Sequence, residues 1–561
     1  MEQPKKQNIR IGDLLVELGY VNSQQINAAI EYQQEHKGVR MGKALIDLNY
    51  ITEGQMLEAL GHRLNYDVVN ISDITVDAQA LEMIPRAMAE KYSMMGYRMD
   101  DAMYYIIVND PLNFYGIEDI RQVVGLELHI SLAEENSIKD AIQYHYSEVS
   151  AKKAAAKAAT NTTTNLFETV EINIEDTNDD TPIVNLLNSI LLRAYNSNAS
   201  DIHIEPFEKH TSVRMRVDGV ICDFMTLQKN VHNPLIARIK ILGDLDIAER
   251  RIPQDGHFRI GVEGVNLNVR VSVIPTVFGE KAVMRLLANN STIDHAGTFG
   301  MTEKNYKTVR RMIQSPNGLI YLTGPTGSGK STTLYMILEE LAKRDVNIST
   351  IEDPVEKNVA KLNQMQVNNT AGLTFEIGLR ALLRQDPDII MVGETRDSET
   401  ASISVRAAIT GHLVLSTLHT NDAASSVMRL VDMGVEPFMV ATSLVGVIAQ
   451  RLVRKVCSCA EWEPMTQEEA DIVGKPLMRV KHAKGCNLCN NTGYKGRISL
   501  HEVLPLDKNL RAMITAGSSV DEIKQYAIDN LGMDTLKESA IQLVEAGVTT
   551  VDELLKVAYY E

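Results

Sequence analysis

Residues 324–331 read Gly-Pro-Thr-Gly-Ser-Gly-Lys-Ser and fit the phosphate-binding pattern G-x-x-x-x-G-K-[ST]. A short apolar strand is predicted before this loop, at 319–322, and a helix begins directly after it. The glycines let backbone N–H groups converge on phosphates, and the helix N-terminus adds partial positive charge. In this pattern Lys330 reaches the β- and γ-phosphates, and the Ser331 hydroxyl ligates Mg²⁺. A chance match between a strand and a helix is rare, so the chain is predicted to bind ATP with Mg²⁺. The predicted nucleotide-binding residues of the loop are Gly324, Pro325, Thr326, Gly327, Ser328, Gly329, Lys330, Ser331 and Thr332.

Strands and helices alternate from about residue 295 onward. Short apolar strands are predicted at 348–351, 389–392 and 413–416, with helical stretches between them. This alternation is typical of an α/β domain, in which a parallel sheet carries helices on both faces.

Acidic residues follow two of these strands. Glu394 comes just past the strand at 389–392, and Glu352 follows the strand at 348–351. One carboxylate can hold the water shell of the metal while the other orients the attacking water. His412 and His419 bracket the strand at 413–416, and either one can sense the γ-phosphate. The alternatives are solvated acids at strand ends and structural histidines.

The N-terminal part contains an internal repeat. The segment from Arg10 to Val21 aligns with the segment from Arg40 to Ile51. Each copy predicts a short helix, a turn and a second helix, because apolar residues recur at i, i+3 and i+4. Duplicated helical hairpins without a ligand are one interpretation, and a ligand-binding repeat is the other.

The rest of the chain divides by changes in composition. Thr160 to Asp180 is rich in Thr, Asn and acids, which is typical of a linker, and strands with alternating pattern follow near 201–205 and 213–217. The predicted domains are a helical repeat at 1–75, a small α/β domain at 76–150, a linker at 151–180, an α+β domain at 181–290 and the phosphate-loop domain at 291–561.

Four of the five cysteines fall close together, as C-x-C and C-x-x-C pairs. They are Cys457, Cys459, Cys486 and Cys489. Two close pairs of thiolates suit tetrahedral Zn²⁺, so we predict a zinc-binding insertion at 457–489. Free or buried thiols are the alternative. The fifth, Cys222, is predicted to be a core residue.

Charge and hydropathy exclude several classes of protein. The formal net charge is −17, which disfavours a general nucleic-acid binder. The N-terminus lacks an apolar signal segment, and the longest strongly apolar run, Phe438 to Ala449, is too short to span a membrane. We therefore expect a cytoplasmic protein in which this run forms a buried helix.

Further segments match family motifs. They are Thr350–Glu356, Asp388–Glu394, Thr410–Asp422, Ser200–Pro206 and Arg250–Gly256. With the phosphate loop, they resemble the secretion ATPase superfamily, specifically its type IV pilus assembly and type II secretion ATPases, and the resemblance covers nearly the whole chain. It implies a RecA-like ATPase domain, preceded by an α+β (PAS-like) domain and by a helical or mixed regulatory domain.

The resemblance also implies function. It predicts a homo-hexamer on the cytoplasmic face of the inner membrane, with peripheral membrane association. Such a ring hydrolyses ATP at subunit interfaces and drives a platform protein that adds pilins, together with other pilus or secretion components. Glu394 and Glu352 would be the catalytic acids, and His412 and His419 part of a nucleotide-sensing box. Arginines at family positions would approach the phosphates, surface ion pairs being the alternative: Arg214, Arg216, Arg238, Arg380 and Arg384.

The N-terminal repeat resembles the MshEN domain, which binds cyclic di-GMP through two tandem motifs. The first copy matches well, and the second has Asn49 in place of Gly and Arg63 in place of Gln. Predicted contact residues are Arg10, Gly12, Gly19, Gln33, Arg40, Gly42 and Arg63.

We therefore expect an ATPase for type IV pilus extension, regulated by cyclic di-GMP. A type II secretion ATPase is the nearest alternative. A nucleic-acid or DNA-uptake translocase is disfavoured by the −17 charge and by the lack of a basic–aromatic strip. A cyclic-dinucleotide sensor with a degenerate ATPase site is disfavoured by the intact Gly-Lys-Ser and both acidic strand ends.

Overall fold

The computed structural model describes residues 10–36, 38–164, 181–287, 299–486, 489 and 491–558. The chain forms two compact units. Unit 1 contains Met1–Leu286 with the short segment Cys486–Asn491, and unit 2 contains Leu287–Gly485 with Thr492–Glu561. None of the described helices is long and apolar enough to cross a membrane.

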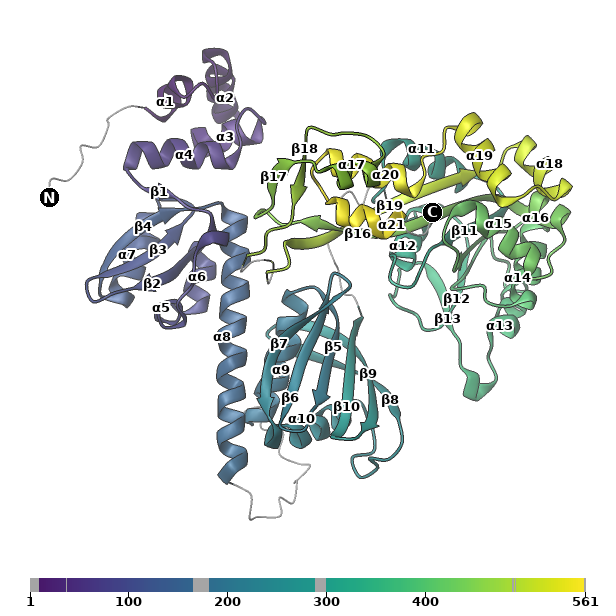
Figure 1. The fold of residues 1–561 in the computed structure, drawn as a ribbon, viewed down its shortest axis with the longest axis horizontal. Helices are drawn as coiled ribbons and strands as arrows, with labels where there is room; N and C mark the ends of the chain where they lie inside the picture. Colours follow the sequence, from purple (N-terminus) through teal and green to yellow (C-terminus); the bar gives the residue numbers. More distant parts are fainter. Residues whose placement is uncertain are drawn as a thin grey trace. The chain divides into compact units, whose positions relative to one another are not determined.

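The N-terminal repeat folds as two helical hairpins (Figure 1). Its helices are α1 (Ile11–Glu17), α2 (Ser23–Glu35), α3 (Met41–Asp47) and α4 (Glu53–Leu64). The Asn22 side chain caps α2 in a capping box, and Thr52 does the same for α4. Leu15 and Leu45, equivalent in the two copies, are fully buried in one shared core. The predicted duplication of a helix–turn–helix is confirmed.

A small α/β layer follows the repeat. Its sheet has the order β1-β4-β3-β2, with β3 and β4 parallel and β2 and β3 antiparallel. The elements are β1 (Asp67–Val68), η1 (Ile71–Asp73), α5 (Ala78–Met83), α6 (Arg86–Tyr92), β2 (Met94–Met99), β3 (Met103–Val108), α7 (Phe114–Val124) and β4 (Glu127–Leu132).

Helix α8 (Glu135–Thr164) corrects the predicted start of the linker. We expected a flexible segment from residue 151, but residues 151–164 continue this single long helix (Figure 1). The Ala-rich run is a strong helix former. Ala154 and Ala158 are also buried in a core with Leu187 and Leu191 of α9, so tertiary packing adds to propensity. The rest of the expected linker, 165–180, lies outside the described residues.

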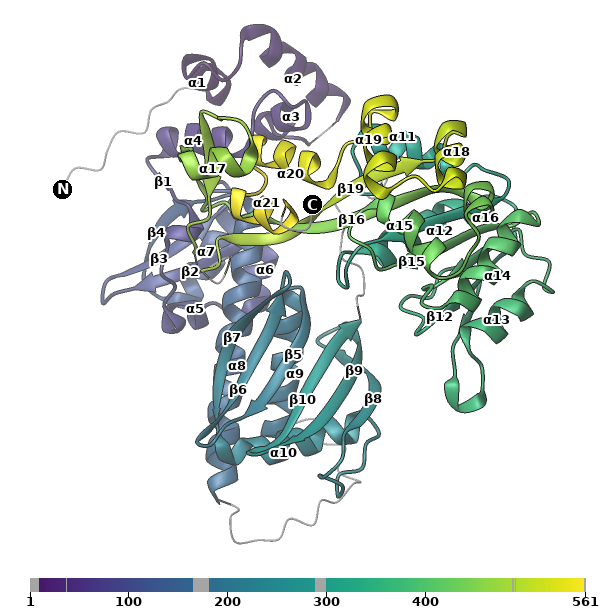
Figure 2. The ribbon, with the colours of Figure 1, turned by 45° about the vertical axis from the view of Figure 1, so that its right-hand side comes forward.

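A six-stranded antiparallel-rich sheet forms the next layer, in the order β7-β6-β5-β10-β9-β8 (Figure 2). Its alternating residues, such as Ile202 and Ile204, face a core shared with α9 and α10. The elements are α9 (Pro182–Asn196), β5 (Ala199–Pro206), β6 (His210–Val217), β7 (Val220–Gln228), α10 (Lys229–Leu242), β8 (Gln254–Val262), β9 (Val265–Thr276) and β10 (Gly279–Leu287).

Unit 2 is built on a seven-stranded sheet in the order β13-β12-β14-β15-β11-β16-β19. All of its neighbouring strands pair in parallel except β19, which is antiparallel to β16. The four short apolar strands predicted from sequence are confirmed as β11 (Gly318–Thr323), β12 (Ile348–Glu352), β14 (Ile389–Val392) and β15 (Leu413–Leu418). Two separate apolar cores border this sheet, as expected for an α/β fold with both faces covered.

The remaining strands of unit 2 are β13 (Leu362–Gln366), β16 (Leu444–Val456), β17 (Glu461–Pro464), β18 (Arg479–His482) and β19 (Tyr494–Pro505). Its helices are α11 (Glu303–Met312), α12 (Lys330–Leu341), η3 (Asn369–Ala371), α13 (Phe375–Leu382), α14 (Ser398–Ile409), α15 (Ala423–Asp432), α16 (Pro437–Ser443), α17 (Gln467–Val473), α18 (Lys508–Ala516), α19 (Val520–Leu531), α20 (Leu536–Glu545) and α21 (Val551–Ala558).

The apolar run from Phe438 to Ala449 is not the single buried helix that we expected. Helix α16 ends at Ser443, and Leu444 begins strand β16. The β-branched residues Val445, Val447 and Ile448 favour a strand, and β16 lies in the sheet between β11 and β19.

Candidate functional site

The phosphate loop lies between β11 and α12, where the sequence pattern placed it. Gly324, Gly327 and Gly329 all have positive φ, at 141°, 79° and 86°. A Cβ on Gly324 would also lie 2.3 Å from the backbone oxygen of Gln450. Glycine is therefore required here by both backbone conformation and space, which leaves the loop amides free to face phosphates.

Lys330 is the first residue of α12 and is buried, with 8% of its surface exposed. Its Nζ donates to the carbonyl oxygens of Gly324, at 2.6 Å, and Pro325, at 3.0 Å. Burial lowers the pKa of Lys330 to about 8, while Glu394 opposes that shift and Arg451 adds to it. Phosphate oxygens are stronger acceptors than these two carbonyls, so the donor set fits a nucleotide triphosphate.

The acidic residues lie at the same edge of the sheet as the loop. Strands β12, β14, β15 and β11 are consecutive neighbours and all parallel, so their carboxyl ends point to one edge. That edge carries Glu352, Glu394, His419 and the phosphate loop. Together with the Ser331 hydroxyl, these carboxylates are oxygen ligands of the kind that Mg²⁺ prefers.

Glu394 is largely buried and lies beside Arg396 and His419. Its side chain is 14% exposed, and its Oε2 lies 2.5 Å from Nε of Arg396 and 3.6 Å from Nε2 of His419. A threonine–serine network holds the backbone around it, because Thr395 N–H donates to Thr417 O and the Thr417 hydroxyl donates to Gly393 O. The carboxylate is thus presented from a rigid strand end.

Glu352 is almost completely buried, at 3% exposure, and both of its carboxylate oxygens accept hydrogen bonds. The Tyr335 hydroxyl donates to Oε2, and Thr350 Oγ1 donates to Oε1 at 2.6 Å. Gln364 Nε2 also donates to Oε1, at 3.1 Å. A Cβ on Gly393 would lie 3.3 Å from the Glu352 Cα, so Gly393 lets the two strand ends approach closely.

His412 and His419 lie at opposite ends of strand β15. His412 precedes β15, and its Nδ1 lies 3.0 Å from the carbonyl oxygen of Ala407. Gly318, the first residue of β11, pairs with Leu413. The six-residue strand separates the two histidines by about 20 Å, so within one chain only His419 reaches the loop.

The candidate arginines do not contact the phosphate loop within the described contacts. Arg380 pairs with Glu376 at 3.0 Å and with Glu399 at 3.1 Å, and Arg384 donates to the carbonyl oxygen of Arg380. Arg380 thus makes surface ion pairs and Arg384 a hydrogen bond to the backbone, and a role of either at the phosphates stays a prediction.

The other arginines belong to unit 1. Arg214 pairs with Glu205 at 2.5 Å, and Arg216 lies 3.8 Å from Asp201 and donates to Gly219 O. Arg238 is half-buried on α10. A role of these three arginines at the phosphates stays a prediction.

Sequence reasoning missed the contribution of β16. Gln450, 2% exposed, lies against the loop, because a Cβ on Gly329 would be 2.9 Å from its Nε2. Arg451 acts electrostatically on Lys330 and donates to Asn421 Oδ1 at 3.3 Å. Both residues directly follow the run that we predicted to be a helix, and they lie on the strand β16 that its second half begins.

The four cysteines come together. Their Sγ atoms all lie within 4.8 Å of one another, and those of Cys486 and Cys489 are 3.6 Å apart. Sulfurs around tetrahedral zinc are separated by about 3.8 Å, given Zn–S bonds of about 2.3 Å. The donor set therefore fits Zn²⁺, held by Cys457, Cys459, Cys486 and Cys489.

Several residues predicted to contact cyclic di-GMP have structural roles. Gly12 packs against Ile26, and Gly42 against Met56, where a Cβ would come within 2.6 Å of its methyl group. Gly19 has φ of 76° in the turn between α1 and α2.

The remaining four residues of that set are polar and differ in how they are held. Arg10 is exposed, Arg63 is half-buried, and Arg40 pairs with Asp110 at 2.6 Å. Gln33 Nε2 donates to Val39 O. Three arginines on one repeat suit a phosphate ligand, and their role stays a prediction.

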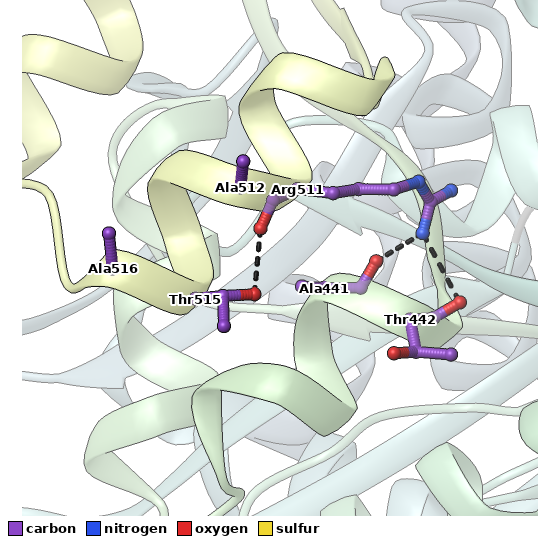
Figure 3. Close-up of a pocket in the computed structure, with 6 residues that line it drawn as sticks. All are labelled: Ala441, Thr442, Arg511, Ala512, Thr515 and Ala516. Atoms are coloured by element: carbon purple, nitrogen blue, oxygen red, sulfur yellow. Dashed lines mark hydrogen bonds between the residues drawn. The ribbon is translucent and has the colours of Figure 1, made fainter.

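A pocket lies between α16 and α18 (Figure 3). It is lined by Ala441, Thr442, Arg511, Ala512, Thr515 and Ala516, none of which is a predicted site residue. Arg511 donates to the carbonyl oxygens of Ala441 and Thr442 near the end of α16. Because a cation there satisfies helix-terminal carbonyls, a structural role explains this arginine.

Comparison with protein families gives two matches. Residues 176–556 match the family described as Type II/IV secretion system protein, and residues 64–152 match the MshEN domain. The second match covers the small α/β layer and the start of α8. It begins after Arg63, so it does not include the repeat residues that we predicted to contact cyclic di-GMP.

Known proteins align over most of the chain. It is 39% identical to the type IV pilus assembly ATPase PilB of Myxococcus xanthus, over 97% of this chain and 98% of that protein. It is 40% identical to type II secretion system protein E of Klebsiella pneumoniae, over 86% and 98%. Among solved structures, the ATPase DotB of Legionella pneumophila has a TM-score of 0.51 at 23% identity, covering 67% of this chain and 95% of that one. The last likeness shows the fold.

Proposed function

The chain belongs to the Type II/IV secretion system protein family, and we propose that it is the motor ATPase for type IV pilus extension. Hydrolysis of ATP follows from the family. The observation that carries the finer proposal is alignment over nearly the full length with a pilus assembly ATPase, 97% of this chain and 98% of that one.

The strand-end geometry gives each residue a role in hydrolysis. Mg²⁺, when bound with ATP, would supply positive charge that neutralises the developing negative charge. Lys330 would stabilise negative charge on the β- and γ-phosphates, and the Ser331 hydroxyl and Glu394 are the residues that would hold the metal. Glu352 accepts a proton from the attacking water, which it also orients. His419 lies beside Glu394, and there it can respond to the γ-phosphate.

Assembly and location are part of the same proposal. A homo-hexamer on the cytoplasmic face of the inner membrane would let Arg216 and Arg238 of unit 1 approach phosphates. The ring would transmit nucleotide-driven movement to a membrane platform protein that adds pilin subunits.

A type II secretion ATPase is the second candidate, favoured by the 40% identity to type II secretion system protein E over 86% of the chain. Neighbouring genes discriminate between the two: pilin genes support pilus extension, and genes for secretion-channel components support protein secretion.

Regulation by cyclic di-GMP is proposed from the MshEN match at 64–152 and from the arginine-bearing repeat beside it. The arginines Arg10, Arg40 and Arg63 supply charges of the sign that a phosphodiester ligand needs.

Phosphate release by the purified chain tests the site. We expect Lys330→Ala and Glu394→Gln to lower kcat by about 100-fold or more, because the first removes a charge that stabilises the phosphates and the second removes a proposed metal-holding carboxylate. Glu340→Gln is a matched control, since Glu340 lies on α12 and pairs with the exposed Lys343. A folded Glu394→Gln chain that keeps the parental turnover would falsify the assignment.

A further inference from the structure

We propose that Tyr335 is a positioning residue that holds Glu352 in its working orientation and ties it to the phosphate loop. The inference rests on the proposed role of Glu352 in hydrolysis. Tyr335 lies on α12, the helix that begins with Lys330, and its hydroxyl donates to Oε2 of Glu352.

The direction of each hydrogen bond around Tyr335 is fixed by counting protons. Backbone N–H groups of Glu356 and Lys357 both approach the Tyr335 oxygen, at 3.1 and 3.3 Å. An N–H can only donate, so these contacts use the lone pairs of the hydroxyl. The single hydroxyl proton is left for Glu352, whose Oε2 accepts it.

Burial keeps that proton in place. Tyr335 is 6% exposed, and burial, with the hydrogen bond to Glu352, raises the pKa of Tyr335 above its ordinary value of 10.0. The hydroxyl therefore remains a donor throughout the physiological range of pH.

The other carboxylate oxygen of Glu352 is also held. Thr350 and Gln364 both donate to Oε1, and Gln364 also donates to the carbonyl oxygen of Lys357. An ionised carboxylate offers about four acceptor positions, of which three are filled here. The remaining position lies on Oε2, the oxygen that Tyr335 orients, and is the one available to an attacking water.

The same helix carries the phosphate-binding lysine. Tyr335 lies five positions after Lys330, or about 7.5 Å along the helix axis. A helix is stiff over this length, so Tyr335 fixes the carboxylate relative to the bound phosphates as well as to the loop at 353–357. Proximity of this kind is a large part of phosphoryl-transfer catalysis.

The test is steady-state hydrolysis by the full chain carrying Tyr335→Phe, which removes only the hydroxyl. We expect kcat to fall by about 10- to 100-fold, which is typical when a residue that orients a functional group is lost. KM for ATP and the affinity for a fluorescent ADP analogue should stay within about twofold, because Tyr335 touches no phosphate.

Tyr526→Phe is the matched control. Its hydroxyl also donates to a carboxylate, Asp507, at 3.0 Å and also accepts a hydrogen bond, from Asn509 at 2.8 Å. This variant loses the same kind of contact in the same unit, and we expect the parental kcat. Melting curves of both variants show whether each one is folded.

A double variant separates positioning from a general structural effect. In the Glu352→Gln background, measured by single turnover with radiolabelled ATP, Tyr335→Phe should cause no further loss, because Tyr335 acts through Glu352. A multiplicative loss, a weaker affinity for the ADP analogue, or a parental kcat for Tyr335→Phe each overturns the inference. Parental turnover by Glu352→Gln would instead overturn the proposed role of Glu352.

Gln364→Met provides a second test if Tyr335→Phe does not fold. Gln364 lies half-buried on the edge strand β13, where a substitution is tolerated more easily. Losing its hydrogen bond to the charged carboxylate should lower kcat about tenfold with KM unchanged. An unchanged kcat in this variant contradicts the claim that orientation of Glu352 limits the rate.

Discussion

A buried histidine makes the folding stability of this chain depend on pH. His501, on β19, is 3% exposed, and its Nε2 has no hydrogen-bond partner among the described residues. Burial lowers the pKa of His501 from 6.5 to about 3. An imidazole in this place is neutral in the folded chain, because a charge there would lose its hydration without compensation.

This histidine predicts a pH dependence of stability. The unfolded chain binds a proton near pH 6.5 and the folded chain resists it down to about pH 3, so unfolding becomes easier as pH falls between these values. We expect His501→Leu to lessen the fall in melting temperature between pH 6.5 and 4. The control is His62→Gln, at an exposed position, which should melt like the parent at each pH. If the melting temperature of His501→Leu falls as much as that of the parent between pH 6.5 and 4, the assignment to His501 is wrong.

Whole elements show where local sequence patterns succeed and where they fail. The short apolar strands of unit 2 are bounded by glycines, acids and helices, and each was predicted within a residue or two. The prediction of a single helix from Phe438 to Ala449 was wrong, because an apolar run cannot distinguish a short buried helix from a buried strand. The second half of this run belongs to strand β16, which pairs with β11.

For the cysteine-bearing insertion, we predict that replacing one cysteine of either pair causes loss of the bound metal. Cys457→Ser and Cys489→Ser should lower bound zinc from about one per chain to near zero, since structural sites need all four ligands. Proteolysis between the pairs, around β17 and β18, should become faster because metal binding orders such segments. Cys222→Ser is the control and should keep its zinc, measured by elemental analysis.

The whole molecule combines an N-terminal helical repeat, for which we propose a regulatory role, with an α+β domain and an ATPase domain on one chain. Calorimetry of the full chain with cyclic di-GMP tests the proposed regulation. We expect saturable heat at ligand concentrations on the order of tens of micromolar. Arg10→Ala and Arg63→Ala should weaken binding, whereas Arg121→Ala, which removes an exposed ion pair with Glu118 on α7, should not. No heat from the parent chain would return the repeat to a purely structural role.

The second copy of the repeat keeps the turn of the first copy although one glycine of the motif is replaced. Asn49 replaces a glycine yet adopts φ of 56°, close to the 76° of Gly19. Asparagine tolerates the left-handed region, so the turn is kept and the departure from the motif costs little in fold.

The sequence by itself determined the phosphate loop, the parallel strands around it, the acids at their ends and the cysteine pairs. Each of these depends on residues close together along the chain, where spacing translates directly into geometry. Only the three-dimensional structure shows that Tyr335 and Gln364 hold Glu352 and that β16 brings Gln450 to the loop. Those contacts join separate elements, and the order of strands in a sheet is set by packing rather than by any local pattern.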